Sequence, residues 1–79
     1  MIIKVFGPGC KKCETLKQNV EAAINDLGME NVEIKKISDI NEMVEAGIMS
    51  SPTLMIDGEI KTEGKLPSVQ EIKDLLEKE

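Results

Sequence analysis

Aromatic residues and histidine are nearly absent from this sequence. Phe6 is the single aromatic residue among 79, and there is no Trp, Tyr or His. Proteins that bind single-stranded nucleic acid stack its bases on aromatic side chains, which this chain hardly supplies. The formal net charge of −5 would also repel a phosphate backbone. We therefore expect no nucleic-acid partner, and the core has to be built from Ile, Val, Leu and Met.

Long apolar runs are absent as well. No segment reaches the roughly 18 apolar residues that a membrane-spanning helix needs. The N-terminal stretch MIIKVFGPG is too short and too rich in strand-forming residues for a secretory signal. We expect a cytoplasmic protein with no membrane contact. In that reducing compartment a permanent disulfide between the two cysteines is not expected, and it would close only a small loop.

The length allows one domain, which we place at residues 1–79. Hydrophobic residues make up 41% of the chain and charged residues 32%, which is typical of a soluble globular protein. We expect a monomer that needs no cofactor.

Hydrophobic periodicity predicts four strands and three helices in the order βαβαββα. Strands are expected at residues 2–6, 32–37, 53–56 and 60–63. A long helix with an apolar stripe of Cys13, Leu16, Val20, Ile24 and Leu27 should end at Gly28. A short helix should begin at Asp39 and end at Gly47, and a last helix should begin at Ser68.

Turn and cap signals support this order. Asp57-Gly58 is a strong two-residue hairpin signal. Ser68 and Glu71 form a capping-box pattern, and Asp39 is followed by Glu42 in a similar spacing. The first βαβ unit requires parallel strands, whereas the hairpin requires antiparallel ones. The sequence therefore predicts an α/β fold with a four-stranded mixed sheet flanked by helices.

The motif GPGCKKC places Cys10 and Cys13 at the start of the first helix. Residues three apart on a helix have Cβ atoms about 5–6 Å apart, whereas a disulfide needs roughly 3.5–4.5 Å. A small tightening of the first turn would therefore join the two sulfurs reversibly. Cys10 lies at the helix entrance, near unpaired N–H groups, and Cys13 belongs to the apolar stripe. We expect Cys10 to attack a disulfide and Cys13 to resolve the mixed disulfide.

Six other residues are candidates for binding the substrate around these thiols. Gly9 directly precedes Cys10, and Lys11 and Lys12 either favour a thiolate and guide an acidic partner or are simply solvated. The segment SSPTL puts a proline at the entrance to a strand. We predict a cis Ser51–Pro52 bond that presents the Ser51 backbone to an extended substrate.

Gly64 is the last candidate. It either lets a backbone approach the rim of the site or completes a turn.

Three segments, VFGPGCKKC, SDINEMVEAGIMSSPTLMIDGEI and EGKLPSVQEIKDLL, together resemble the small thioredoxin-like proteins of archaea and bacteria called redox-active disulfide proteins. The specific feature is the CxxC motif followed further along by S-P-T. The resemblance covers nearly the whole chain and implies a thioredoxin-like fold. It also implies a cytosolic thiol–disulfide oxidoreductase, with an upstream disulfide reductase and disulfide-containing target proteins as partners.

The sequence departs from that family in several places. Thioredoxins have W-C-G-P-C, whereas here Gly9 precedes Cys10 and two lysines stand between the cysteines. The first strand has Lys4 and no buried acid, which leaves the acceptor of the Cys13 proton open. The C-P-Y-C and Gly-Gly-Asp segments of glutaredoxins are also missing, which leaves glutathione use open. The direction of electron flow is not encoded in these motifs.

Two alternatives use the same thiols differently. A copper or zinc carrier would bind metal through the CxxC thiolates, but a zinc site needs four ligands, and one chain without histidine offers two. Copper chaperones have M-x-C-x-x-C and end in a strand, whereas here Pro8 lies two residues before Cys10 and residues 68–78 predict a helix. The second alternative is a redox-sensing interaction domain without turnover.

Overall fold

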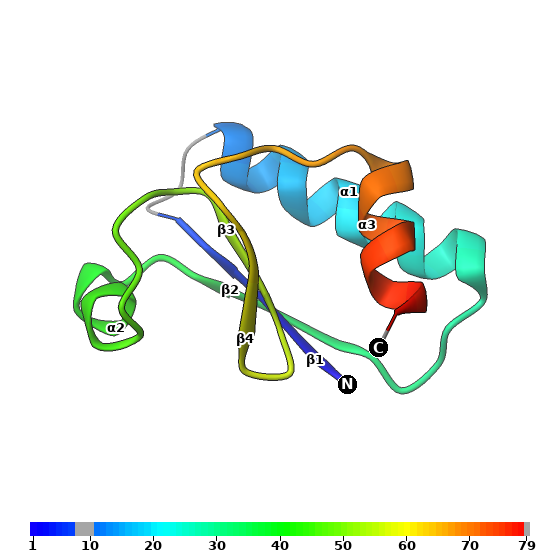
Figure 1. The fold of residues 1–79 in the computed structure, drawn as a ribbon, viewed down its shortest axis with the longest axis horizontal. Helices are drawn as coiled ribbons and strands as arrows, with labels where there is room; N and C mark the ends of the chain where they lie inside the picture. Colours follow the sequence, from blue (N-terminus) through cyan, green and yellow to red (C-terminus); the bar gives the residue numbers. More distant parts are fainter. Residues whose placement is uncertain (8–10, 79) are drawn as a thin grey trace.

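The predicted order of elements is confirmed in the computed structural model, which describes residues 1–7 and 11–78 (Figure 1). The elements are β1 (Ile2–Phe6), α1 (Lys11–Leu27), β2 (Glu33–Ile37), α2 (Ile40–Glu45), β3 (Thr53–Ile56), β4 (Glu59–Glu63) and α3 (Val69–Glu77). The strands alternate with helices until the hairpin of β3 and β4, as the sequence indicated.

The four strands form one mixed sheet in the order β2-β1-β3-β4. Strand β1 is parallel to β2 and antiparallel to β3, and β3 is antiparallel to β4. At the hairpin both turn residues have positive φ, 48° at Asp57 and 84° at Gly58, as a two-residue turn of this kind requires. The Asp57 Oδ1 also accepts a hydrogen bond from the N–H of Ile2 at 2.7 Å, which fastens the hairpin to the start of β1.

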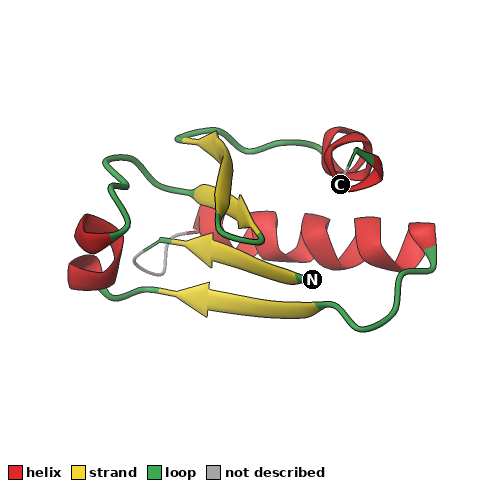
Figure 2. Cartoon of the chain, turned by 60° about the horizontal axis from the view of Figure 1, so that its bottom comes forward, coloured by secondary structure: helices red, strands yellow, loops and turns green. Residues whose placement is uncertain are grey.

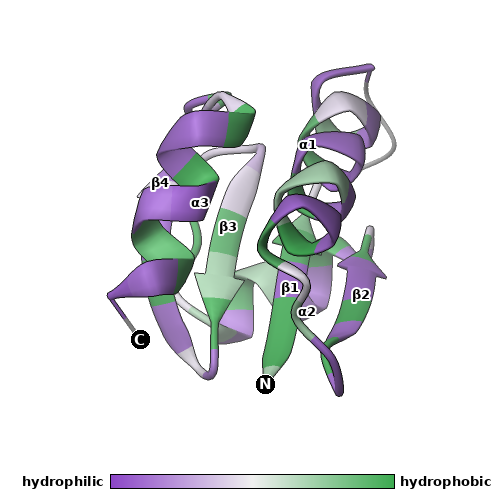
Figure 3. Ribbon diagram, turned by 90° about the vertical axis from the view of Figure 1, so that its right-hand side faces the viewer, coloured by the Kyte–Doolittle hydropathy of each residue, from purple (hydrophilic) through white to green (hydrophobic). Residues whose placement is uncertain are grey.

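Helices α1 and α3 lie side by side on one face of the sheet (Figure 3). Alternate residues of β1 and β3 point to this face because side chains alternate along a strand. The large cluster on this face consists of Ile3, Val5, Leu16, Val20, Ala23, Leu54, Ile56, Ile72 and Leu76. Within the α1 stripe, Ile24 and Leu27 are only half-buried, and Ala23 is fully buried in their place.

The opposite face is covered at one end by the short helix α2 (Figure 2). A small cluster of Phe6, Met43, Ile48 and Met55 lies there. Helix α2 is capped by Asp39, whose carboxylate accepts from the N–H of Asn41 at 2.8 Å. The last helix has the complete capping box predicted for Ser68 and Glu71.

None of the helices in the described part of the chain is long and apolar enough to cross a membrane. The loop between β4 and α3 runs along α1, where Asn19 Nδ2 donates to the carbonyl of Pro67 at 3.1 Å. This contact holds the chain segment that follows Gly64 against the same helix that carries Cys13.

Candidate active site

The candidate site lies where the start of α1, the end of β1 and the start of β3 come together (Figure 1). Helix α1 begins at Lys11, and Cys13 lies in its first turn with a fully buried side chain. This burial confirms the expectation that Cys13 belongs to the apolar stripe. Gly9 and Cys10, which the sequence also assigns to the site, lie outside the described residues.

The Ser51–Pro52 peptide bond is cis, as predicted. Pro52 is fully buried, whereas Ser51 beside it is exposed. Among the described residues the backbone N–H and C=O of Ser51 make no hydrogen bond. Its polar backbone groups are therefore not engaged by the described part of the chain.

Two hydrogen bonds hold this loop in place. The Thr53 hydroxyl donates to the carbonyl of Ser50 at 2.7 Å, and Thr53 is fully buried. The N–H of Gly64 donates to the carbonyl of Pro52 at 2.9 Å. Both contacts fix the backbone on either side of the cis bond.

Gly64 fulfils both of the roles that the sequence left open. Its φ of +72° is the left-handed conformation of a turn. A Cβ at this position would also lie 3.2 Å from the Cβ of Ser50, so the missing side chain allows the close approach of the two loops. Gly64 therefore lies on the rim of the site, next to the segment that contains the cis bond.

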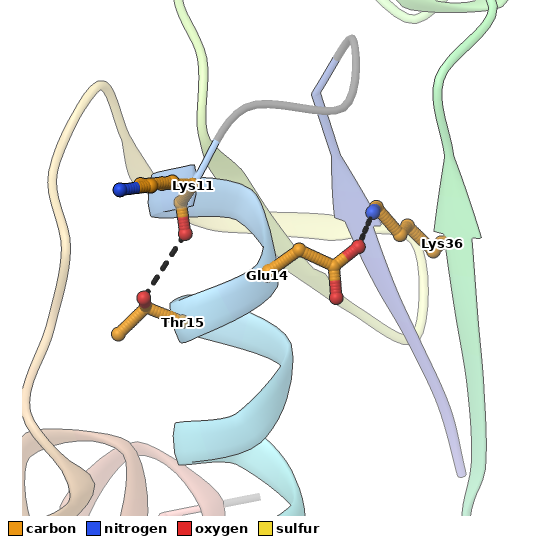
Figure 4. Close-up of polar contacts among 4 residues, drawn as sticks. All are labelled: Lys11, Glu14, Thr15 and Lys36. Atoms are coloured by element: carbon orange, nitrogen blue, oxygen red, sulfur yellow. Dashed lines mark hydrogen bonds and ion pairs between the residues drawn. The ribbon is translucent and has the colours of Figure 1, made fainter.

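Lys11 and Lys12 are exposed at the first turn of α1. Neither forms an ion pair with any residue in the described ranges 1–7 and 11–78. The carbonyl of Lys11 accepts a hydrogen bond from the Thr15 hydroxyl at 3.0 Å (Figure 4). Both ammonium groups therefore remain in solvent near the helix entrance, where their charges are open to an acidic partner.

Glu14, which follows Cys13, forms an ion pair with Lys36 of β2 (Figure 4). The pair connects the first turn of α1 to the edge strand of the sheet. The sequence did not indicate it, because no local spacing relates a helix residue to a residue on a later strand.

We call residues 46–52, which lead from α2 to β3, the cis-proline loop. An apolar groove of about 520 Å³ adjoins the exposed side of this loop. It is lined by Ile40, Met43, Val44, Gly47, Ile48, Met49, Ser50 and Ser51. Ile40, Val44 and Met49 have 64%, 68% and 92% of their surface exposed. The sequence placed Ile40 and Val44 on a helix, but their exposure depends on how little of the sheet α2 covers.

The described residues include no group of three or more Cys, Asp or Glu side chains that could hold a metal ion. Met43 and Met55 are buried in the small cluster, whereas Met49 is exposed at the groove.

Comparison with known proteins gives the same fold and places the chain in a family. The thioredoxin domain model matches residues 1–77. Two archaeal proteins named thioredoxin are similar to the chain. The one from Methanothermobacter thermautotrophicus is 38% identical over 76 residues, which is 96% of this chain and 97% of that protein. The one from Methanocaldococcus jannaschii is 42% identical over 76 residues, covering 96% and 86%.

Among solved structures, one described as the structure of a malarial protein superposes with a TM-score of 0.70. It covers 98% of this chain and 93% of that chain at 15% sequence identity, so it supports the fold alone. The similarity to the two archaeal thioredoxins extends over nearly the whole sequence and accompanies the site geometry described above. The chain belongs to the thioredoxin family and is a thiol–disulfide oxidoreductase.

Proposed function

We propose that this chain is an electron carrier that reduces disulfides in target proteins through the Cys10–Cys13 dithiol. Cys10 is the nucleophile and Cys13 is the resolving cysteine. The observation that carries this assignment is the position of Cys13, buried in the first turn of α1 beside the cis Ser51–Pro52 bond. A target cannot reach a fully buried sulfur, so the first attack falls to the cysteine at the helix entrance.

The reaction has two exchange steps. The Cys10 thiolate attacks one sulfur of the target disulfide, that S–S bond breaks, and the other target sulfur leaves as a thiolate. The Cys13 thiolate then attacks Cys10 sulfur, the mixed disulfide breaks, and the second target sulfur leaves as a thiolate. Two electrons pass to the target, whose thiolates take up two protons, and the carrier ends with a Cys10–Cys13 disulfide.

A disulfide reductase must return two electrons and two protons to that disulfide before the next cycle. We place the carrier in the cytoplasm, because a reducing compartment keeps such a pair available as a dithiol. We also expect it to act as a monomer. The exposed Lys11 and Lys12 give the site entrance a local positive charge on an acidic chain, which favours partners with acidic residues near their cysteines.

The target chain docks across Ser51 and into the adjoining apolar groove. Ser51 offers backbone groups that make no hydrogen bond within residues 1–7 and 11–78, and the groove continues from Ser51 along α2. The occupant we assign is the segment that flanks the reactive cysteine of the target, with an apolar side chain in the groove. Continuity between the groove and the cis-proline loop supports this assignment.

Reduction of insulin with dithiothreitol as the electron source tests the proposal. The wild type should accelerate the reaction, and Cys10→Ser should abolish the acceleration. Cys13→Ser should accumulate a mixed disulfide with the target, because the second exchange step is missing. Iodoacetamide near neutral pH should label Cys10 before Cys13; the reverse order, or a fast reaction with Cys10→Ser, would show that the roles are assigned wrongly.

A further inference from the structure

We propose that Gly7 is a positioning residue whose missing side chain provides the space for the Cys13 sulfur and so makes the second exchange step fast. The proposal rests on the role proposed above for Cys13. Gly7 directly follows β1, ahead of the segment that leads to the cysteines. It is buried, and its N–H donates to the carbonyl of Ile37 at 2.9 Å, which extends the pairing of β1 with β2.

The space around Gly7 is the first observation. A Cβ added to Gly7 would lie well under 3.0 Å from Cys13 Sγ, a separation that real Cβ atoms essentially never show. It would lie 3.1 Å from the Cβ of Cys13 and 3.8 Å from the Cβ of Ser51. The Cα of Gly7 therefore lies between the buried Cys13 and Ser51 of the cis-proline loop. The Cys13 sulfur occupies the volume that a side chain at position 7 would need.

The backbone conformation is the second observation. Gly28, Gly47, Gly58 and Gly64 all have φ between 64° and 84°, where glycine is favoured for its backbone freedom. Gly7 has no such φ, so its backbone conformation is open to other residues. What requires glycine at position 7 is the sulfur of Cys13, and that requirement is specific to the site.

A methyl group at position 7 would displace the sulfur, because the space between α1 and the sheet is already filled. Leu16 and Val20 on the same stripe are fully buried against the sheet, so the helix cannot move inward. Either the Cys13 side chain adopts another rotamer or the first turn of α1 shifts outward. Both changes alter the path of Cys13 sulfur to Cys10 sulfur, and neither changes the thiol that attacks first.

Reaction with 5,5′-dithiobis(2-nitrobenzoate) separates the two steps. Attack by Cys10 on the reagent releases one thionitrobenzoate, and attack by Cys13 on the resulting mixed disulfide releases the second. For Gly7→Ala we expect the first release to stay within about twofold of the wild type and the second to slow at least tenfold. A second release within twofold of the wild type would overturn the proposal.

Gly28→Ala is the matched control. Gly28 follows the far end of α1, has a φ of +64° and has nothing within 4 Å of an added Cβ, so this variant loses stability through backbone strain alone. Both releases should keep their wild-type rates in Gly28→Ala. A similar slowing in the two variants would show that lost stability, and not the sulfur position, is responsible.

A double variant identifies the sulfur as the cause. In the Cys13→Ala background the clash with Sγ is gone, and the nearest contact of the added Cβ is the Cβ of residue 13 at 3.1 Å. Gly7→Ala should therefore lower the urea midpoint less than half as much in this background as it does when Cys13 is present. An equal shift in both backgrounds would contradict the proposal. If Gly7→Ala does not fold beside Cys13, the double variant should still fold, and a double variant that also fails to fold would contradict the proposal. If the wild type itself releases no second thionitrobenzoate, the proposed role of Cys13 fails and the stability cycle alone tests Gly7.

Discussion

The two faces of the sheet are covered very differently. On one face, α1 and α3 bury a cluster of nine residues, and seven of these are completely inaccessible to solvent. On the other, the six-residue helix α2 covers a cluster of four, each of which keeps a few per cent of its surface exposed. Two long elements exclude solvent from the first face, whereas one short helix leaves its own apolar residues Ile40 and Val44 in solvent.

This difference separates two requirements of the reaction. The well-packed face holds α1, and with it Cys13, in a fixed position against Gly7. The lightly covered face presents apolar surface next to Ser51, which is the surface we propose for accepting and then releasing a target. The cis-proline loop is the boundary between them, since Pro52 is buried while Ser51 is exposed. Stability and recognition are therefore expected to respond to different substitutions.

The largest expected effect is a loss of stability on the well-packed face. Leu16→Ala should cost about 3–5 kcal/mol, because a fully buried leucine leaves a cavity that neighbours on two helices and the sheet cannot fill. Met43→Ala in the small cluster should cost about 2 kcal/mol or less, since the site is open on one side and Met is flexible.

Urea denaturation of both variants measures this comparison. A domain of this length has a total stability of roughly 4–12 kcal/mol, so Leu16→Ala is expected to be close to unfolding. Equal costs for the two variants would show that the small cluster is as tightly packed as the large one.

The next effect is on recognition and concerns the lightly covered face. Ile40→Ser in the groove should raise the KM for a protein disulfide about fivefold, since the exposed side chain would be buried by the target at a gain of about 1 kcal/mol. The release of thionitrobenzoate from a small reagent should not change. Ile60→Ser on β4 is the matched control, an exposed isoleucine outside the groove.

Steady-state insulin reduction separates KM from kcat for these two variants. Ile40→Ser should lose no more than about 0.5 kcal/mol of stability, because Ile40 is 64% exposed, whereas Ile60→Ser should lose about 1 kcal/mol, because Ile60 is 39% exposed. If Ile40→Ser and Ile60→Ser raise KM equally, the groove is not the docking surface.

Much of the fold could be predicted from local sequence signals. The bounds predicted for the strands at 2–6 and 53–56 are those observed, because apolar runs bounded by Gly, Pro and Asp leave little freedom in placing them. The Asp57-Gly58 turn and the Ser68–Glu71 capping box were also predicted correctly. Each of these features depends on residues fewer than five positions apart, where backbone geometry alone decides.

The features of the site could be predicted from the sequence only where they depend on local motifs. The burial of Cys13 and the cis bond at Pro52 were predicted, whereas the close approach of the Cys13 sulfur to Gly7 was missed. Nothing in the sequence distinguishes a glycine needed for space from one needed for φ, because the contact with Cys13 depends on how α1 packs on β1. Likewise no local pattern distinguishes Ala23, which is fully buried, from Ile24, which is half-buried.

A smaller effect is expected at the boundary between the two faces. Thr53→Val removes the hydrogen bond to the Ser50 carbonyl, and Thr53→Ser keeps it. Thr53→Val should lower the free energy of unfolding by only about 1 kcal/mol, because Ser50 is exposed and its carbonyl can accept a hydrogen bond from water instead. It should also raise the KM for insulin two- to threefold, because the cis-proline loop is held less firmly without this hydrogen bond. A KM unchanged in Thr53→Val but raised in Thr53→Ser would assign the effect to the methyl group of Thr53.

The smallest effect is expected from the ion pair between Glu14 and Lys36, which joins α1 to β2 on the well-packed face. Their side chains are 54% and 24% exposed, so solvent screens most of the attraction and the coupling energy should stay below about 1 kcal/mol. Lys73 and Asp26, at 24% and 53%, form a matched pair far from the cysteines. Double-mutant cycles with Glu14→Gln and Lys36→Met, and with Asp26→Asn and Lys73→Met, should give similar values that vanish in about 1 M salt. A coupling above about 2 kcal/mol for Glu14 and Lys36 alone would mean that the helix carrying Cys13 is held by charge as well as by the packing of the large cluster.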